Sequence, residues 1–204
     1  MKVLMINGSC HEKGSTFTVL TEIAEELKKN DVETEIVQLG SAPQRDCVGC
    51  GECRKRGSGL CVFNDDIVNV IIDKAKTADG FVFGTPVYYA HPSGRLLSVL
   101  DRAFYAGSSA FAFKPGAAVA VARRAGTTAS VDVLNKYFTI AKMPVVSSTY
   151  WNVAHGVCAS EVPEDEEGLQ TMRNLARNMA WLIRSLKGAT PPENEKTHRT
   201  NFVR

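Results

Sequence analysis

Short apolar runs alternate along the chain with longer amphipathic stretches. Five of the short runs predict strands, at residues 3–6, 35–39, 81–83 and 117–122 and from Val145 and Val146 toward Tyr150. The unbroken runs, such as residues 3–6, are typical of strands that are buried on both faces of a sheet. Apolar positions three and four residues apart predict helices at residues 15–29, 65–76, 93–105, 130–141 and 164–186.

The alternation of five strands with five helices predicts a doubly wound α/β domain. We expect its flavodoxin-like form, a five-stranded parallel sheet of order 2-1-3-4-5 with helices on both faces. The domain would span residues 1–188, with a cysteine-rich insertion at residues 46–62. Neither the glycine fingerprint of nicotinamide-binding Rossmann domains nor a Walker A loop follows the first strand, so the sequence disfavours both classes.

Residues 189–204 are polar, contain Pro191-Pro192 and show no periodicity. The segment is either a disordered tail or an arm that anchors on a neighbouring subunit through Phe202, Val203 and Arg204. The arm, together with the aromatic loops described below, leads us to expect a homodimer or homotetramer.

The 204-residue chain is 44% hydrophobic and 23% charged, which is sufficient for a sizeable core without disulfides or metals. Its formal net charge of +2 gives little electrostatic reason to bind nucleic acid or an anionic membrane. No apolar run approaches the ~20 residues of a membrane-spanning helix, and residues 1–8 do not resemble an export signal. We therefore expect a cytoplasmic protein with no nucleic-acid or membrane partner.

Ligands of doubly wound sheets bind at the carboxyl ends of the strands, so the loops that follow the strands carry the candidate chemistry. The first loop, residues 7–16, contains glycines and hydroxyls and leads into a helix whose free N–H groups suit a phosphate. The same loop is also compatible with an ordinary helix start that is capped by Ser15.

The loops after the third and fourth predicted strands contain aromatic and basic side chains. Tyr88 and Tyr89 lie between two prolines and would form a platform for a planar ring, although packing at the sheet edge would explain them equally. Arg123 and Arg124 suit a phosphate, a ring carbonyl or a dinucleotide, or they are solvated surface residues.

Three motifs in order along the chain resemble the NAD(P)H-dependent FMN reductase family of flavodoxin-like proteins. They are Gly8-Ser9 to Ser15-Thr16, then Thr85-Pro86-Val87-Tyr88-Tyr89, then Ser93-Gly94 to Leu100-Asp101-Arg102. The resemblance extends from residue 1 to about residue 186 and implies noncovalent FMN. The phosphate would lie in the first loop and the isoalloxazine ring against the third-strand loop. Many members have Pro-Arg where this chain has Cys10-His11, so the loop lacks that permanent cation.

The resemblance also implies the residues that contact the flavin. Carried over by position, the phosphate would be lined by Ser9, His11, Ser15 and Thr16, and the ring by Pro86, Val87, Tyr88 and Tyr89. The predicted cofactor-binding set also includes Phe17, Thr85, Arg123 and Gly126. The candidates for shaping the substrate face are Tyr88, Tyr89, His91 and Trp151, and His155 is a candidate proton donor.

Four of the six cysteines have the spacing Cys47-x2-Cys50-x2-Cys53-x7-Cys61, between the second strand and the second helix. Closely spaced thiolates are the usual ligands of iron–sulfur clusters. The motif resembles that of the iron–sulfur flavoprotein branch of the same family, which implies a [4Fe–4S] cluster beside FMN. A zinc site, free thiols or a reversible disulfide, and a loop that no longer holds a cluster are the alternatives.

These observations predict an FMN-dependent oxidoreductase that takes electrons from NAD(P)H. A flavin accepts a hydride and passes electrons on singly or in pairs. The acceptor would be a small quinone, nitro or azo compound, or a redox partner reached through a [4Fe–4S] cluster. The alternative is a flavin and iron–sulfur electron carrier or redox sensor without small-molecule turnover. A receiver domain of the same fold would need acidic residues where the first strand ends in Asn7-Gly8.

Overall fold

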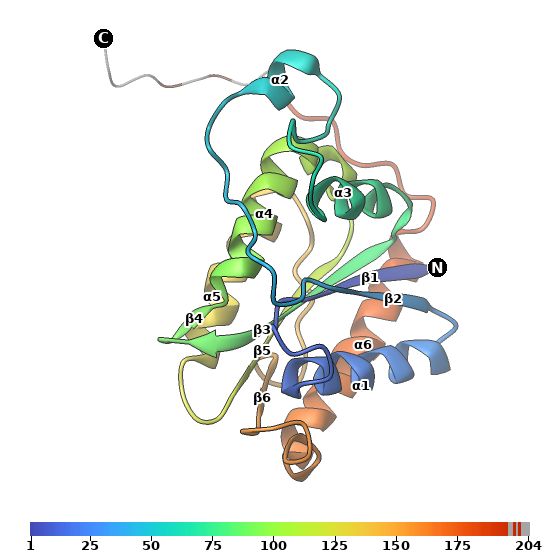
Figure 1. Cartoon of the computed structure of the whole chain (residues 1–204). Helices are drawn as coiled ribbons and strands as arrows, with labels where there is room; N and C mark the ends of the chain where they lie inside the picture. The colour runs from blue at the N-terminus through green and yellow to red at the C-terminus, as the bar shows by residue number, and fades with distance from the viewer. Residues whose placement is uncertain (196–197, 199, 201–204) are drawn as a thin grey trace.

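The computed structural model, which describes residues 1–195, 198 and 200, has a sheet at its centre (Figure 1). Five strands run parallel in the order β2-β1-β3-β5-β6, and β4 pairs antiparallel with β3. The strands are β1 (Lys2–Asn7), β2 (Glu33–Gln38), β3 (Gly80–Tyr88), β4 (His91–Pro92), β5 (Gly116–Ala122) and β6 (Val153–His155). The five parallel strands have the predicted order, so the flavodoxin-like fold is confirmed.

Helices cover both faces of this sheet, because its central strands contribute apolar side chains to each face. Leu4 and Ile6 of β1 pack toward α3 (Val68–Thr77), α4 (Gly94–Gly107) and α5 (Thr127–Ile140). Val3 and Met5 pack on the opposite face toward α1 (Ser15–Lys29) and α6 (Glu166–Leu186), which lie side by side. The remaining elements are α2 (Glu52–Arg56) and two 3₁₀ turns, η1 (Ser108–Ala110) and η2 (Val162–Glu164).

The fifth strand was predicted in the wrong place. Val145 forms only an isolated bridge with Gly116, and the strand that completes the sheet is β6, farther along the chain. The polar segment between them is drawn toward α6, where Ser148 Oγ donates to Thr171 O at 2.6 Å. These contacts to α6 replace the ladder hydrogen bonds that a strand toward Tyr150 would need.

Two short elements were also missed by the sequence prediction. β3 continues through Tyr88 and turns directly into β4, so the expected third-strand loop is a hairpin. α2 lies within the cysteine-rich insertion between Gly51 and Gly57, both of which have positive φ.

Within the part of the chain that the structure describes, no helix is long and apolar enough to cross a bilayer. Residues 189–195 of the predicted tail form no helix or strand, whereas Phe202, Val203 and Arg204 of the predicted arm lie outside the described residues.

The aromatic core under α5 gives a test of the packing. Phe138 is fully buried and stacks on Phe83 with ring centroids 5.0 Å apart. Phe138→Ala should lower the free energy of unfolding by about 3–5 kcal/mol, because it removes a large buried ring and leaves a cavity. Ile140→Ala on the same helix is the matched control, because Ile140 is 82% exposed, and it should change stability by less than about 0.5 kcal/mol. Urea unfolding of flavin-free protein measures both, and equal effects would contradict this packing.

Candidate functional site

The first loop is fixed against the middle of β3 and the start of α4 by hydrogen bonds. The Gly8 N–H donates to Gly84 O at 2.8 Å, and Ser93 Oγ donates to Gly8 O at 2.7 Å. A Cβ at Gly8 would lie 2.9 Å from Leu96 Cβ, so only glycine allows this approach. The backbone at the carboxyl end of β1 is therefore held rigidly where a ligand would meet it.

The start of α1 offers N–H groups that no side chain caps. Its N-cap is Gly14, without a side-chain hydrogen bond, and Ser15 is already the first helical residue. The alternative in which Ser15 caps the helix is therefore not observed. No acidic residue lies in the first turn, so the positive end of the helix dipole is free to attract an anion.

The β3–β4 hairpin carries an aromatic side chain at its tip. Its two turn residues, Tyr89 and Ala90, have φ of 51° and 58°, a conformation that glycine or asparagine usually adopts. Tyr89 is fully exposed. Gly126, at the start of α5, packs directly against the hairpin turn, because a Cβ added there would lie 2.5 Å from Ala90 Cα. A strained turn with an exposed aromatic tip is typical of a functional segment.

One cavity of about 260 Å³ brings most of the predicted flavin contacts together at the carboxyl edge of the sheet. Its predicted members are Ser9, His11, Ser15, Thr16, Pro86, Val87, Tyr88 and Arg123. The wall is completed by residues that the sequence analysis missed, namely Val121, Ala122, Gly156 and Val157. The position of β5 would have indicated the first two, whereas the misplaced fifth strand hid the last two.

The other predicted contacts lie around this cavity and are not part of its wall. Thr85 Oγ1 is buried, accepts from the Ser93 N–H at 2.9 Å and so joins the hairpin to α4. Tyr89 points into solvent at the hairpin tip, and Gly126 lies under the hairpin. Phe17 is half-buried on α1. Among the substrate-face candidates, His91 lies exposed in β4, and Trp151 is exposed and packs edge-on against Tyr150.

Tyr88 contributes a polar group to the side of the cavity that the hairpin forms. Burial raises the pKa of its phenol, and the neighbouring Cys10, whose Sγ lies 3.8 Å from Tyr88 Oη, raises it further. The phenol therefore keeps its proton at neutral pH and can donate a hydrogen bond to a ligand.

His155 lies in a neighbouring hollow of about 190 Å³ rather than in the main cavity. Its Nδ1 is 3.3 Å from Asp165 Oδ2, and its backbone N–H donates to the same oxygen at 2.7 Å. Asp165 also caps α6 through the Gly168 N–H. The described contacts of His155 are thus those of a residue that joins β6 to the start of α6.

The four motif cysteines line one hollow. Figure 1 shows the segment around α2, which belongs to the cysteine-rich insertion, at the far end of α4 from the hairpin. Cys47, Cys50, Cys53 and Cys61 share this hollow with side chains from the last turns of α4, including Tyr105. All four are free thiols. Within residues 1–195, 198 and 200, no three histidine, cysteine or carboxylate side chains form a group that could hold a metal ion.

Comparison with known proteins confirms the predicted resemblance. The family described as NADPH-dependent FMN reductase matches residues 1–157. An iron–sulfur flavoprotein of Methanocaldococcus jannaschii is 31% identical over 196 residues, which cover 92% of this chain and 100% of that protein. An iron–sulfur flavoprotein of Methanosarcina thermophila is 28% identical over 189 residues, which cover 90% of this chain and 95% of that protein.

Solved structures with little sequence similarity share the fold. RosB, solved with bound 8-demethyl-8-formylriboflavin-5'-phosphate, aligns with a TM-score of 0.72 at 15% identity and covers 99% of this chain and 92% of its own. An archaeal flavodoxin aligns with a TM-score of 0.60 at 12% identity, over 90% of this chain and 99% of its own. These likenesses support the flavodoxin-like architecture.

The contact between Gly126 and the hairpin gives a test of how the site is built. Gly126→Ala would place a Cβ against Ala90 at a φ of +90°, so we expect a loss of about 1–3 kcal/mol in the free energy of unfolding. Faster hydrogen exchange at residues 87–92 should accompany it. Gly94→Ala is the control, because nothing lies within 4 Å of its Cβ, and it should not destabilise the protein. A hairpin that exchanges as slowly in Gly126→Ala as in the parent would show that Gly126 does not support it.

Proposed function

Because the chain belongs to the NADPH-dependent FMN reductase family, we propose that it is an FMN-dependent oxidoreductase that takes electrons from NAD(P)H. Family membership supports a flavin oxidoreductase or electron carrier, and the relatives described above are named iron–sulfur flavoproteins. The proposed acceptor is a small quinone, nitro or azo compound, or a redox partner reached through a [4Fe–4S] cluster.

The observation that carries the flavin assignment is the cavity that joins an uncapped helix start to a wall formed by Pro86, Val87 and Tyr88. Ser15 and Thr16 would bind the FMN phosphate with their hydroxyls and backbone N–H groups. Pro86, Val87 and Tyr88 would lie against the ring, where the Tyr88 phenol would donate a hydrogen bond. When bound, FMN accepts a hydride and releases electrons singly or in pairs.

The cysteine loop fits an iron–sulfur cluster by the chemistry of its donors. Four free thiols line one hollow together with the buried side chain of Arg102. The hollow is small, about 20 Å³. Open space surrounds the Cβ positions of the four positive-φ glycines of the loop, which are Gly49, Gly51, Gly57 and Gly59, so the loop has room to widen. A [4Fe–4S] cluster takes one thiolate at each iron, whereas a single zinc needs four ligands at about 2.3 Å from one point. The close run Cys47-x2-Cys50-x2-Cys53 is a ligating pattern of such clusters, whereas zinc sites usually take two separated Cys-x2-Cys pairs, so the spacing along the sequence favours the cluster.

The two proposed centres lie at opposite ends of α4. Ser93 at the start of α4 contacts the first loop, whereas Tyr105 near its end lines the cysteine hollow. A helix of 14 residues is about 21 Å long, and electron transfer slows steeply with distance. This separation favours exchange with a second copy of the chain or with a protein partner, so it also supports the electron-carrier alternative.

Introducing a negative charge at the start of α1 tests the phosphate site. Ser15→Asp should weaken FMN binding at least tenfold, because a carboxylate would repel the phosphate. The same change should leave the stability of the flavin-free protein unchanged or raise it by about 0.3–1 kcal/mol, because the carboxylate complements the helix dipole. Fluorescence titration with FMN and urea unfolding measure the two effects. Unaltered FMN affinity would exclude this helix start as the phosphate site.

Cysteine variants and a choice of electron donor test the function. In protein purified without oxygen, Cys61→Ser should lose most of the iron and acid-labile sulfide and keep FMN. Cys158→Ser, outside the motif, should keep FMN as well as the iron and sulfide.

The electron donor is tested separately. NADPH or NADH should bleach the flavin absorbance of the parent protein within seconds. Bleaching by a reduced protein donor alone would favour the electron carrier, and flavin without iron in the parent would leave an FMN-only reductase.

A further inference from the structure

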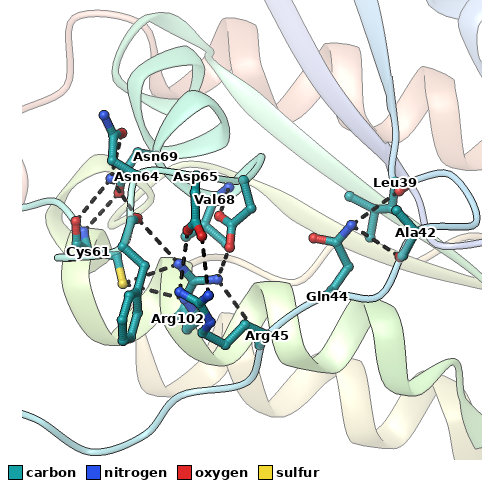
Figure 2. A network of polar contacts seen from close by, with 12 residues as sticks. Leu39, Ala42, Gln44, Arg45, Cys61, Asn64, Asp65, Val68, Asn69 and Arg102 are labelled. Atoms are coloured by element: carbon teal, nitrogen blue, oxygen red, sulfur yellow. Dashed lines mark hydrogen bonds and ion pairs between the residues drawn. The ribbon is translucent and has the colours of Figure 1, made fainter.

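Arg102 is one of the largest fully buried side chains of the chain, yet it carries a permanent charge. It belongs to α4, and its side chain is 1% exposed. Figure 2 shows its guanidinium directed at Cys61 and at the segment around Arg45 and Asp65. A buried cation is costly unless it is paired and hydrogen-bonded, so its partners indicate its purpose.

The guanidinium has five N–H donors, and the structure gives them five contacts. Nε and Nη2 each lie 3.4 Å from Cys61 Sγ. Nη1 donates to Arg45 O at 3.3 Å and to Asp66, and Nη2 donates to Phe63 O at 3.4 Å. Burial by itself would lower the pKa of Arg102, but the hydrogen bonds to Asp66 and Cys61 outweigh it and raise the pKa, so the side chain stays charged.

Two of these donors meet a single sulfur atom. A neutral thiol is a weak acceptor, whereas a thiolate accepts charge-assisted hydrogen bonds. The ion pair with Asp66 and the two carbonyl contacts would already hold the loop on α4. The bidentate approach to Cys61 Sγ is therefore an arrangement for a sulfur that carries negative charge, as it does when it binds a metal.

The backbone of Cys61 is held as firmly as its sulfur. The Cys61 N–H donates to Asn69 Oδ1 at 2.8 Å, and Asn69 Nδ2 donates to Cys61 O at 2.9 Å (Figure 2). Cys61 is thus fixed at its amide, its carbonyl and its sulfur by side chains from α3 and α4. The other three cysteines lie on the glycine-rich part of the loop.

We propose that Arg102 is the positioning residue of the cluster, which holds the sulfur of Cys61 as a ligand and raises the reduction potential. The proposal rests on the proposed cluster. Reduction adds one electron and no proton, so the cluster and its four thiolates gain one negative charge. A fixed cation with two N–H···S contacts stabilises that added charge, and both charge and hydrogen bonds to sulfur set the potential of such clusters.

The test compares Arg102→Gln and Arg102→Lys with the parent and with Arg45→Gln. Arg45 directly precedes the same insertion, is paired with the exposed Asp65 and undergoes the same change in charge. Each protein is purified without oxygen, assayed for FMN, iron and sulfide, and titrated with dithionite while electron paramagnetic resonance records the reduced cluster. Resonance Raman spectra report the iron–thiolate stretching frequencies.

At the midpoint potential of the parent, the ratio of reduced to oxidised cluster should be at least tenfold lower in Arg102→Gln, which for one electron corresponds to 59 mV. Arg102→Lys keeps the charge but not the forked contact, so its shift should be smaller and its iron–thiolate frequencies should still change. Arg45→Gln should match the parent. If Arg102→Gln does not fold, the same comparison is made with Arg102→Lys.

Two outcomes would overturn the proposal, and they differ from each other. A parent protein that binds FMN but takes up no iron would overturn both the cluster and the role of Arg102. A parent with a cluster whose potential and Raman frequencies are unchanged by either Arg102 variant would leave the cluster in place and overturn only the role of Arg102.

Discussion

Helix α4 is held by a buried polar side chain at each end, and each of these contacts organises one of the two candidate sites. At its start, Ser93 Oγ donates to Gly8 O and the Ser93 N–H donates to Thr85 Oγ1, which brings the first loop and the hairpin together. Near its end, Arg102 ties the cysteine-rich insertion to the helix through Cys61, Asp66 and two carbonyls. Between these points the helix packs on a sheet whose central strands, β1, β3 and β5, contribute apolar side chains to both faces. The rigid helix therefore sets the positions of both sites.

The sequence predicted the parts of the fold whose local pattern agrees with the tertiary structure. Unbroken apolar runs gave β1, β3 and β5, because a strand buried on both faces needs apolar side chains at every position. Val145 and Val146 looked equally strand-like, yet the hydrogen bond from Ser148 to α6 takes the chain out of the sheet before β6. A three-residue strand and a two-residue hairpin arm are too short to show a periodic signal.

The candidate site was predictable where topology alone places a loop. The carboxyl ends of β1, β3 and β5 meet at one edge of a doubly wound sheet, so Ser9, Tyr88 and Arg123 line one cavity as expected. The contact between Arg102 and Cys61 was not predictable, because it joins residues 41 positions apart and depends on how the insertion folds over α4. In the sequence, Arg102 was visible only as the last residue of a family-like motif.

The proposed function requires that each chain holds a flavin and a one-electron cluster. Anaerobic titration of the purified holoprotein with dithionite, followed in the visible spectrum, counts the electrons that each chain accepts. We expect about three electrons per chain, two for the flavin and one for the cluster. A value of about two per chain, with only the flavin bands bleached, would contradict it.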